Sequence, residues 1–373
     1  MLLHVLLLLL ASGGASSSIS CYDDQGKPVD WFYLYKLPHP RHEPVLEGLK
    51  YLFMDGESEG WTEGKTLVND SQSAVGRTVG PLYEGGDDVG YVLYNDQPPK
   101  FEGENGICGH TKGVVVFDKQ QGFWLVHSTP HFPPPKSAGQ FSYPSSGISN
   151  GQNFICVTYP FERFQTIGEQ LKINQPHIYD CSIPASLAAA VPAMAQLCKH
   201  TLGRWDNTSI PPSNRSISLL SLAGTEFISF AKGASFANDL YHSWVAPSLQ
   251  SDLLVQFWRR STGLLPSDCS PSWEVLNIDL ISPGQSITFK ATEDHSKWAV
   301  SIGSSRIGSG TAGGWVCVGD INRDEAEEKR GGGTVCRQDT VVWKAYRLAA
   351  LQCETCSGEV KPCEKAAQYR RCS

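Results

Sequence analysis

The chain has 373 residues, with 31 lysines and arginines against 38 aspartates and glutamates, so its formal net charge at pH 7 is −7 with histidine neutral. This length is enough for two domains. Charged residues make up 18% of the chain and hydrophobic residues 40%, with 36 glycines and 23 prolines. That composition fits a loop-rich globular protein with a substantial core, and it excludes a coiled coil and a wholly disordered chain.

The N-terminal segment has the layout of a secretory signal peptide. An apolar, leucine-rich run over residues 2–11 is followed by small residues at 12–15. The run is shorter than the ~20 apolar residues that a membrane-spanning helix needs, and no later stretch approaches that length. We therefore interpret residues 1–18 as a signal peptide and expect no membrane insertion. A buried apolar strand is the alternative interpretation of this run.

The first half of the chain is dominated by strand-like runs. Apolar and β-branched residues bounded by turn residues predict strands over 90–95, 113–118, 123–127 and 153–159. An alanine- and leucine-rich stretch over 178–202 predicts a helix that is interrupted at Pro192. The polar, proline-containing segment that follows it predicts a domain boundary near residue 205.

The second half repeats the mixture of strands and helices. Strands are predicted over 288–290, 298–302 and 314–318, and helices over 235–241 and 339–350. Strands and helices that alternate along the whole chain indicate a mixed α/β architecture.

An internal repeat is the most informative feature of the sequence. His110-Thr111-Lys112 begins a predicted strand that is followed by a glycine-containing turn and a second, tryptophan-bearing strand. His295-Ser296-Lys297 begins the same succession of elements. The two motifs are about one domain apart, so each half of the chain contributes one of them. A single His-x-Lys tripeptide is common and usually carries no chemistry, whereas two at equivalent places point to a shared site.

Two His-x-Lys pairs supply the groups that cleavage of a phosphodiester needs. Alternation along an extended strand places the histidine and lysine of each motif on one face. One neutral imidazole can attack phosphorus and form a phosphohistidine, the other imidazole can protonate the leaving oxygen, and the lysines can hold the phosphoryl oxygens. This chemistry requires no metal and no cofactor. Because one histidine must be protonated, we expect activity in mildly acidic conditions.

Cysteines and glycosylation sequons agree with a secretory route. Twelve cysteines in a chain with a signal peptide predict several disulfides. The only closely spaced pair, Cys353 and Cys356, has no second pair at zinc-ribbon spacing, so we expect no structural metal. Acceptor sequons begin at Asn69, Asn207 and Asn214, and the last two lie in the polar segment that is interpreted as a surface loop.

Longer motifs show that the chain resembles the deoxyribonuclease II family. The matching stretches are 20–23, 26–38, 109–113, 122–135 (GFWLVHSTPHFPPP), 294–298 and 317–323. The resemblance implies a phospholipase D-like fold, in which a pseudo-two-fold repeat of two α/β halves shares one active site. It assigns residues 19–205 to the first half and 206–353 to the second. Residues 354–373 form a cysteine-containing tail to which we assign no role.

The resemblance also implies a function. Family members are lysosomal acid endonucleases that hydrolyse double-stranded DNA with little sequence specificity and without a metal, and that leave 3′-phosphate and 5′-hydroxyl ends. Such an enzyme, lysosomal or secreted, would degrade DNA of engulfed apoptotic cells and expelled nuclei. Two alternatives stay open from the residues. One is a phospholipase D-like phosphodiesterase with a non-DNA substrate, and the other is a non-catalytic DNA-binding glycoprotein.

Individual roles follow from the resemblance residue by residue. It makes His110 with Lys112 and His295 with Lys297 the catalytic pairs, His127 a further active-site histidine, and Asp320 and Asn322 supporting groups. It leaves open which histidine is the nucleophile. By similarity to phospholipase D enzymes the N-terminal one, His110, is the usual candidate, whereas we expect His295 to be indispensable. The implied disulfides join Cys21 with Cys156, Cys269 with Cys353, and Cys317 with Cys336. Arg259 and Arg260 beside Trp258 are either a DNA-contacting patch or a solvated helix end.

Overall fold

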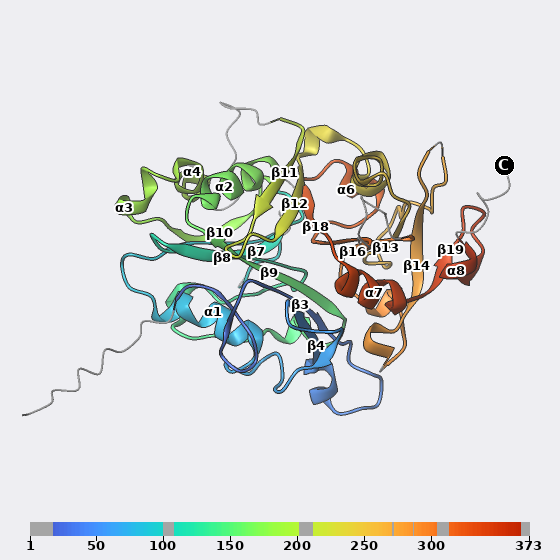
Figure 1. The fold of residues 1–373 in the computed structure, drawn as a ribbon, viewed down its shortest axis with the longest axis horizontal. Coiled ribbons are helices and arrows are strands. Elements are labelled where there is room, and N and C mark those ends of the chain that lie inside the picture. Colours follow the sequence, from blue (N-terminus) through green and yellow to red (C-terminus); the bar gives the residue numbers. More distant parts are fainter. Residues whose placement is uncertain are drawn as a thin grey trace, which may run out of the picture.

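The computed structural model describes residues 18–99, 108–200, 212–270, 272–285, 287–303 and 313–366. The interpreted signal peptide up to residue 17, the Asn207 sequon and Cys372 lie outside the described residues. Two large β-sheets, one from each half of the sequence, stand beside each other with helices around them (Figure 1). The chain is therefore the mixed α/β protein that its pattern predicts.

The first sheet has eight strands in the order β10-β6-β7-β8-β9-β3-β4-β5, with antiparallel neighbours throughout. In chain order its strands are β3 (Trp31–Lys36), β4 (Tyr51–Asp55), β5 (Thr62–Glu63), β6 (Gly90–Asn95), β7 (Lys112–Phe117), β8 (Gln121–His127), β9 (Gln152–Pro160) and β10 (Ile178–Ser182). A short hairpin of β1 (Cys21–Tyr22) and β2 (Pro28–Val29) precedes it.

The second sheet has the order β11-β12-β18-β17-β16-β13-β14-β19-β20, and β15 pairs with β14 off this path. Its strands are β11 (Asn214–Leu220), β12 (Glu226–Lys232), β13 (Leu253–Gln256), β14 (Val275–Ile281), β15 (Phe289–Lys290), β16 (Trp298–Ser301), β17 (Trp315–Gly319), β18 (Gly332–Gln338), β19 (Ala350–Glu354) and β20 (Val360–Pro362). Strand order β6-β7-β8-β9 in the first sheet corresponds to β13-β16-β17-β18 in the second, with one His-x-Lys motif at the start of β7 and the other just before β16.

Helices pack on the faces of the sheets. Helix α1 (Ala74–Glu84) lies on one face of the first sheet, and α2 (Arg163–Asn174) and α4 (Pro192–Leu197) lie on the other (Figure 1). The remaining α-helices are α3 (Ala185–Ala188), α5 (Ala246–Leu249), α6 (Glu325–Glu328), α7 (Thr340–Ala349) and α8 (Cys363–Ala366). No helix among the described residues is long and apolar enough to cross a membrane.

One hydrophobic core joins the two sheets. Successive side chains of β3 point to opposite faces, so Tyr33 and Tyr35 enter the core that contains Trp298 and Tyr346 of the second half. The Trp298 and Tyr346 rings lie 5.1 Å apart, and Tyr35 lies 6.4 Å from Tyr346. Because this core is continuous across the halves, groups from both halves are held at fixed relative positions.

Most of the predicted elements are confirmed, with differences around residues 178–202 and 235–241. The seven predicted strands correspond to β6, β7, β8, β9, β15, β16 and β17, and the predicted helix over 339–350 is α7 with Asp339 as its N-cap. The helix predicted from residue 178 is wrong at its start, because residues 178–182 form β10, which pairs with β6. The interruption predicted at Pro192 is confirmed, because α3 ends at Ala188 and Pro192 begins the separate helix α4.

The helix predicted over 235–241 is also wrong. A 3₁₀ turn (Ala234–Phe236) and a π-helix (Tyr241–Val245) occupy this region, and Ala237 between them has a positive φ of 51°. Asn214 lies at the start of β11 and is half-buried, so this sequon is in a strand and not in the expected surface loop. Asn69 lies exposed before α1.

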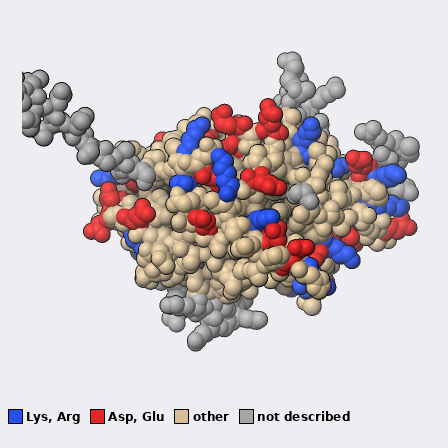
Figure 2. Space-filling view, turned by 90° about the horizontal axis from the view of Figure 1, so that it is seen from below, with Lys and Arg blue, Asp and Glu red and all other residues tan. Residues whose placement is uncertain are grey.

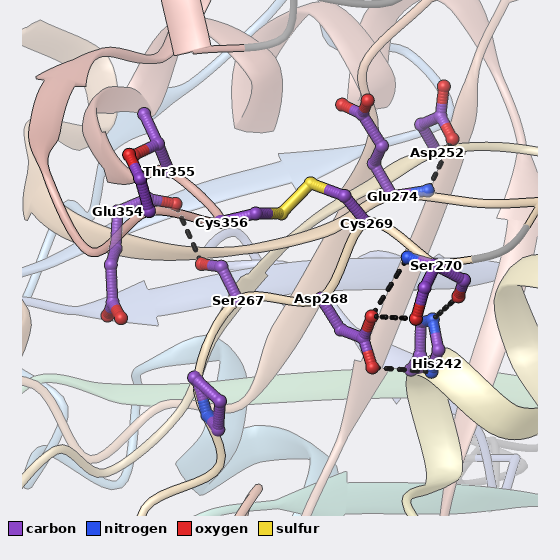
Figure 3. The surroundings of a disulfide bond; sticks show 12 residues. His242, Asp252, Ser267, Asp268, Cys269, Ser270, Glu274, Glu354, Thr355 and Cys356 are labelled. Carbon is purple, nitrogen blue, oxygen red and sulfur yellow. Dashed lines mark hydrogen bonds and ion pairs between the residues drawn. A yellow bond between two sulfur atoms is a disulfide. The ribbon is translucent and has the colours of Figure 1, made fainter.

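Five disulfides occur among the described residues, and they correct one expected pairing. Cys21 with Cys156 and Cys317 with Cys336 are confirmed. The expected bridge between Cys269 and Cys353 is wrong. Cys269 instead bonds Cys356 (Figure 3), Cys353 bonds Cys363, and a further bridge joins Cys181 with Cys198.

The sheet register explains this correction. Cys353 lies within β19 between β14 and β20, opposite Ile278 and Lys361, and this places it beside the start of α8, where Cys363 lies. The turn that follows β19 carries Cys356 to Cys269, and the Ser267 hydroxyl donates to the Glu354 carbonyl alongside at 2.7 Å. The sequence after residue 353 is thus part of the second sheet up to α8.

We expect peptide mapping to report the corrected pairing. Non-reduced proteolysis followed by mass spectrometry should yield one fragment linking Cys269 to Cys356 and another linking Cys353 to Cys363, because the register of β19 separates the two bridges. A fragment linking Cys269 directly to Cys353 would contradict the register of β19. Reduced digests of the same sample are the control.

Candidate active site

The backbone of the first His-x-Lys motif is held by the second half of the chain. The His110 N–H donates to the Gly331 carbonyl at 2.8 Å, and the Lys112 N–H donates to the Asp320 carboxylate at 3.3 Å. Both acceptors lie in segments that border β18 or follow β17. The motif is therefore positioned by residues more than 200 positions away in sequence.

The second motif is held by the first half in the same manner. The His295 N–H donates to the Gly151 carbonyl at 2.9 Å, and the Lys297 N–H donates to the Asn153 side-chain oxygen at 2.7 Å. The Asn153 side-chain amide in turn donates to the Gly319 carbonyl at 3.2 Å. Each half thus anchors the motif of the other half, and the site exists only where the two halves meet.

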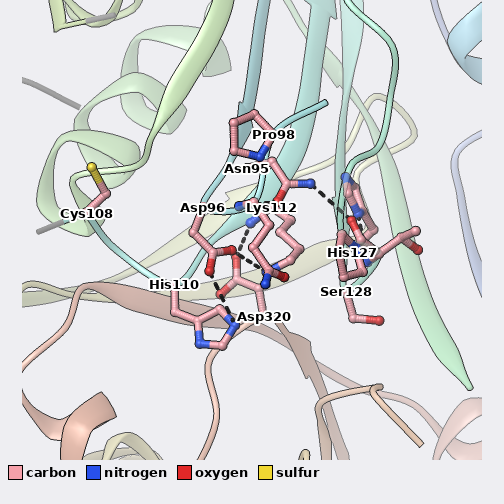
Figure 4. Close-up of polar contacts among 12 residues, drawn as sticks. Asn95, Asp96, Pro98, Cys108, His110, Lys112, His127, Ser128 and Asp320 are labelled. Atoms are coloured by element: carbon pink, nitrogen blue, oxygen red, sulfur yellow. Dashed lines mark hydrogen bonds and ion pairs between the residues drawn. The ribbon is translucent and has the colours of Figure 1, made fainter. Parts of the chain in front are cut away.

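His110 is surrounded by carboxylates. Its Nδ1 lies 2.6 Å from Glu327 Oε1, and its Nε2 lies 3.8 Å from Asp96 Oδ2. Lys112, whose Nζ pairs with the other oxygen of Asp96, converges with His110 on this carboxylate (Figure 4). Burial lowers the pKa of His110 below its ordinary value, although the charges of Glu327 and Asp96 oppose that effect.

Arg330 forms ion pairs with both carboxylates, Glu327 and Asp96. Its guanidinium lies 3.1 Å from Glu327 and 3.4 Å from Asp96. Burial favours the neutral acids, but the charges of His110 and Arg330 outweigh it and lower the pKa of Glu327 to about 2. Lys112, His110 and Arg330 likewise hold the pKa of Asp96 well below its usual range. Both carboxylates therefore stay ionised in mildly acidic solution.

His295 has neutral partners and a cation instead. Its Nδ1 lies 2.8 Å from the Ser128 carbonyl and 3.2 Å from Gln152 Oε1, so Nδ1 carries the proton and Nε2 keeps its lone pair. The Lys297 ammonium lies 3.2 Å from that Nε2 and donates to the His295 carbonyl at 2.7 Å. This contact confirms that the histidine and lysine of the motif share one side.

The two imidazoles differ in basicity, although they lie close enough for the charge of one to affect the other. Burial, followed by the charges of Lys297, Lys112 and His110, lowers the pKa of His295 well below its ordinary value. His110 has the compensating carboxylates that His295 lacks. Neutral His295 can therefore coexist with protonated His110 over a range of acidic pH, and this combination provides a nucleophile beside a proton donor.

Replacement of Glu327 by glutamine should make His110 harder to protonate. Loss of the carboxylate removes the largest opposing charge, so we expect the midpoint of the His110 titration to fall by about one pH unit or more. NMR titration of the histidine side chains measures this directly. Glu325, which is exposed on the same helix, provides the matched control E325Q, which should leave the midpoint in place. An unchanged midpoint in E327Q would contradict the ion pair.

The structure places His127 beside the site and not among its polar contacts. It ends β8, its Nδ1 accepts from the Thr129 N–H at 3.1 Å, and its ring packs against Phe132 and Phe154. Burial lowers its pKa well below the ordinary value, so this imidazole is neutral. The next residue, Ser128, supplies the carbonyl that accepts a hydrogen bond from His295 Nδ1.

The two supporting residues act through the backbone. Asp320 is buried, accepts from the N–H groups of Lys112 and Gly333, both at 3.3 Å, and burial raises its pKa to about 7. Asn322 accepts from the Trp258 N–H at 3.3 Å. Both therefore position neighbours of the histidines, and no hydrogen bond among the described residues joins either side chain to an imidazole.

Sequence reasoning missed the groups that orient the two imidazoles. These are Asp96, Gln152, Asn153, Glu327 and Arg330. Gln152, Asn153 and Arg330 had a signal in the sequence, because each lies within two residues of a glycine that follows the second strand of its repeat. These glycines are Gly151 in the first half and Gly331 in the second. Asp96 and Glu327 had no such signal, since their proximity to His110 depends on the tertiary fold.

No group of three or more His, Cys, Asp or Glu side chains within the described residues is arranged to hold a metal ion. The carboxylates nearest the histidines face cationic side chains, as their ion pairs with Lys112, His110 and Arg330 show.

Comparison with known proteins gives one consistent result. The family model described as Deoxyribonuclease II matches residues 20–356. The chain is 42% identical to Deoxyribonuclease-2-alpha of Mus musculus over 360 residues, which cover 95% of this chain and 98% of that protein. It is 37% identical to Deoxyribonuclease-2-beta of Homo sapiens, covering 91% and 92%, and 37% identical to Plancitoxin-1 of Acanthaster planci, covering 92% and 94%.

Proposed function

This chain belongs to the deoxyribonuclease II family, and from that premise we propose that it is an acid endonuclease that hydrolyses double-stranded DNA without a metal ion. The observation that carries the proposal is the pair of unequal imidazoles, each anchored by the opposite half of the chain. The corresponding strand orders around the two motifs also support a phospholipase D-like repeat with one shared site.

In the first step we assign nucleophilic attack to His295. Its Nε2 lone pair forms the bond to phosphorus, and the bond from phosphorus to the 5′-oxygen breaks. Protonated His110 gives its proton to that departing oxygen, so a 5′-hydroxyl is released. Lys297, already 3.2 Å from Nε2, is within reach of the oxygens of a phosphoryl group bound there.

In the second step water replaces the histidine. His110, now neutral, takes a proton from the attacking water, the bond between phosphorus and Nε2 breaks, and a 3′-phosphate leaves. Glu327 keeps the His110 ring in one orientation through both steps, because its hydrogen bond to Nδ1 fixes the tautomer that presents Nε2. Both imidazoles then return to their starting states.

The proposal predicts a bell-shaped dependence on pH with an acidic optimum. The rate falls as the pH rises through the pKa of His110, which loses its proton, and as it drops through the lower pKa of His295, which gains one. Burial lowers both values, so the active range lies below about pH 6.5. A pH–rate profile on DNA checks this, and an optimum above neutrality would contradict it.

An acidic optimum and the interpreted signal peptide support placement in lysosomes, where the enzyme would degrade DNA of engulfed apoptotic cells and expelled nuclei. Contacts to phosphates bind DNA without reading its sequence, which suits such a role. The face seen in Figure 2 carries acidic and basic side chains interspersed, without a continuous basic patch.

Cleavage of supercoiled plasmid tests the proposal. The purified protein at about pH 5 in EDTA should nick and linearise the plasmid, and the new ends should accept label from a kinase at their 5′-hydroxyls without prior phosphatase treatment. Intact plasmid in the presence of folded, DNA-bound protein would favour the non-catalytic alternative. Cleavage that needs an added divalent metal would refute the metal-independent mechanism.

A further inference from the structure

Trp258 forms an aromatic wall beside His295. It follows β13, which runs antiparallel to β16, so the end of β13 lies next to the residues that precede β16. The rings of Trp258 and His295 lie 5.2 Å apart with their planes at 71°. Trp258 is half-buried, unlike Trp298, which is fully buried in the shared core. Trp258 is therefore partly accessible to solvent next to the His295 ring.

Two neighbouring arginines have different surroundings. Arg259 is held by Glu354 at 2.8 Å, and its guanidinium lies 5.5 Å from the Phe257 ring. Arg260 is exposed and lies 5.2 Å from the centre of the Trp258 ring, a cation–π contact. No ion pair of Arg260 occurs among the described residues. Arg260 is thus an exposed cation beside the Trp258 indole.

We propose that Trp258 is a stacking platform for one nucleobase of the substrate and that Arg260 contacts the adjoining phosphate. The base is the one on the 5′ side of the cleaved bond, whose sugar keeps the phosphate. This inference rests on the proposed function. An aromatic ring next to a cationic side chain is the recurring arrangement for unstacked nucleotides, and it tolerates every base because each base has a π-face.

The assignment to the 5′ side follows from in-line displacement. The leaving 5′-oxygen departs opposite the attacking His295 Nε2, so the nucleoside on that oxygen points away from His295. The retained nucleoside is attached to the side of phosphorus and lies nearer the nucleophile. Trp258, in contact with His295, is placed to meet its base. Stacking requires the base to leave the duplex, so the platform favours sites that open easily.

A double-mutant cycle that removes the Trp258 ring from the protein and the stacked base from the substrate tests the proposal. The substrates are end-labelled duplex oligonucleotides with or without a stable abasic analogue on the 5′ side of one phosphodiester. For the wild type, loss of the base should slow cleavage at that bond roughly 5- to 100-fold. In W258A, intact DNA should be slowed by a similar factor, and loss of the base should add little further effect. W258F should restore most of the difference between the two substrates.

Three results would overturn the proposal. If Trp258 only holds His295 in place, W258A slows both substrates equally and the wild-type preference for the intact base persists. If coupling appears only with an abasic analogue on the 3′ side, the assignment to the retained nucleotide is wrong. If W258F behaves like W258A, stacking is not the source of the effect. A wild-type protein that cleaves neither substrate refutes the proposed function, which is a separate outcome.

Arg260 has its own measurement. R260A should weaken binding of the uncut duplex and reduce the slope of log affinity against log salt by about one, as expected for loss of one phosphate contact. Lys119 supplies the matched control K119A, because it is exposed in the turn at the far end of β7 from Lys112. An R260A slope equal to that of K119A and of the wild type would remove the phosphate contact from the proposal.

Discussion

Replacement of His295 by alanine should abolish DNA cleavage, with a loss on the order of 10⁴-fold or more at about pH 5, as expected when a covalent nucleophile is removed. His295 is the imidazole whose Nε2 keeps a lone pair, because Nδ1 donates to the Ser128 carbonyl at 2.8 Å. Burial, followed by the charges of Lys297, Lys112 and His110, lowers the pKa of His295 and keeps it unprotonated in acid. No other described histidine combines this tautomer with a lysine at Nε2.

Trapping the intermediate makes this prediction sharper. Rapid quenching into base should leave labelled phosphate on the wild-type protein, because the phosphorus–nitrogen bond of a phosphohistidine is more stable in base than in acid, and H295A should carry none. His242 offers a matched control. Its Nδ1 lies 3.3 Å from Asp268 Oδ2 (Figure 3), and neither residue is among the contacts of His110 and His295 described above. H242A should retain activity within about 2-fold. Label retained on H295A would assign the nucleophile elsewhere.

Replacement of His110 by alanine should also abolish ordinary DNA cleavage, by roughly 10²- to 10⁴-fold, because the leaving oxygen then lacks its proton donor. The defect should depend on the leaving group. A substrate with sulfur in place of the bridging 5′-oxygen releases a thiolate, which needs no proton to depart. On that substrate H110A should form the phosphohistidine at close to the wild-type rate.

The second half-reaction should then stall in H110A. No base remains to activate water, so single-turnover kinetics should show a burst of thiol product followed by slow release of the 3′-phosphate. H295A should show no burst on the same substrate. The opposite pattern, a burst in H295A and none in H110A, would exchange the two roles. Circular dichroism and thermal unfolding of each variant exclude a loss of fold as the cause.

Much of the site could be found from the sequence because it lies within local motifs. His110 with Lys112 and His295 with Lys297 are each two residues apart at the start of a strand, so backbone geometry alone brings each pair to one side. Duplication of that motif then indicated that two halves share one site. Strands of alternating or continuous apolar residues were likewise predictable, since the spacing of apolar residues indicates which faces of a strand are buried.

Other features depended on contacts that no local pattern records. Cys269 could pair with several cysteines, and only the register of β19 between β14 and β20 selects Cys356. Residues 178–182 looked helical by composition, but pairing with β6 makes them a strand. Tertiary pairing outweighs local propensity in such cases because the propensity differences amount to less than about 1 kcal/mol per residue.

By itself the sequence determined the α/β class, the two motifs and the family, because all three reside in contiguous residues. Only the tertiary structure distinguished the two histidines. It placed Glu327 and Asp96 beside His110, and the Ser128 carbonyl and Lys297 ammonium beside His295. The physical reason is that an imidazole's basicity depends on burial and on charges within a few ångströms, and those neighbours come from distant parts of the chain.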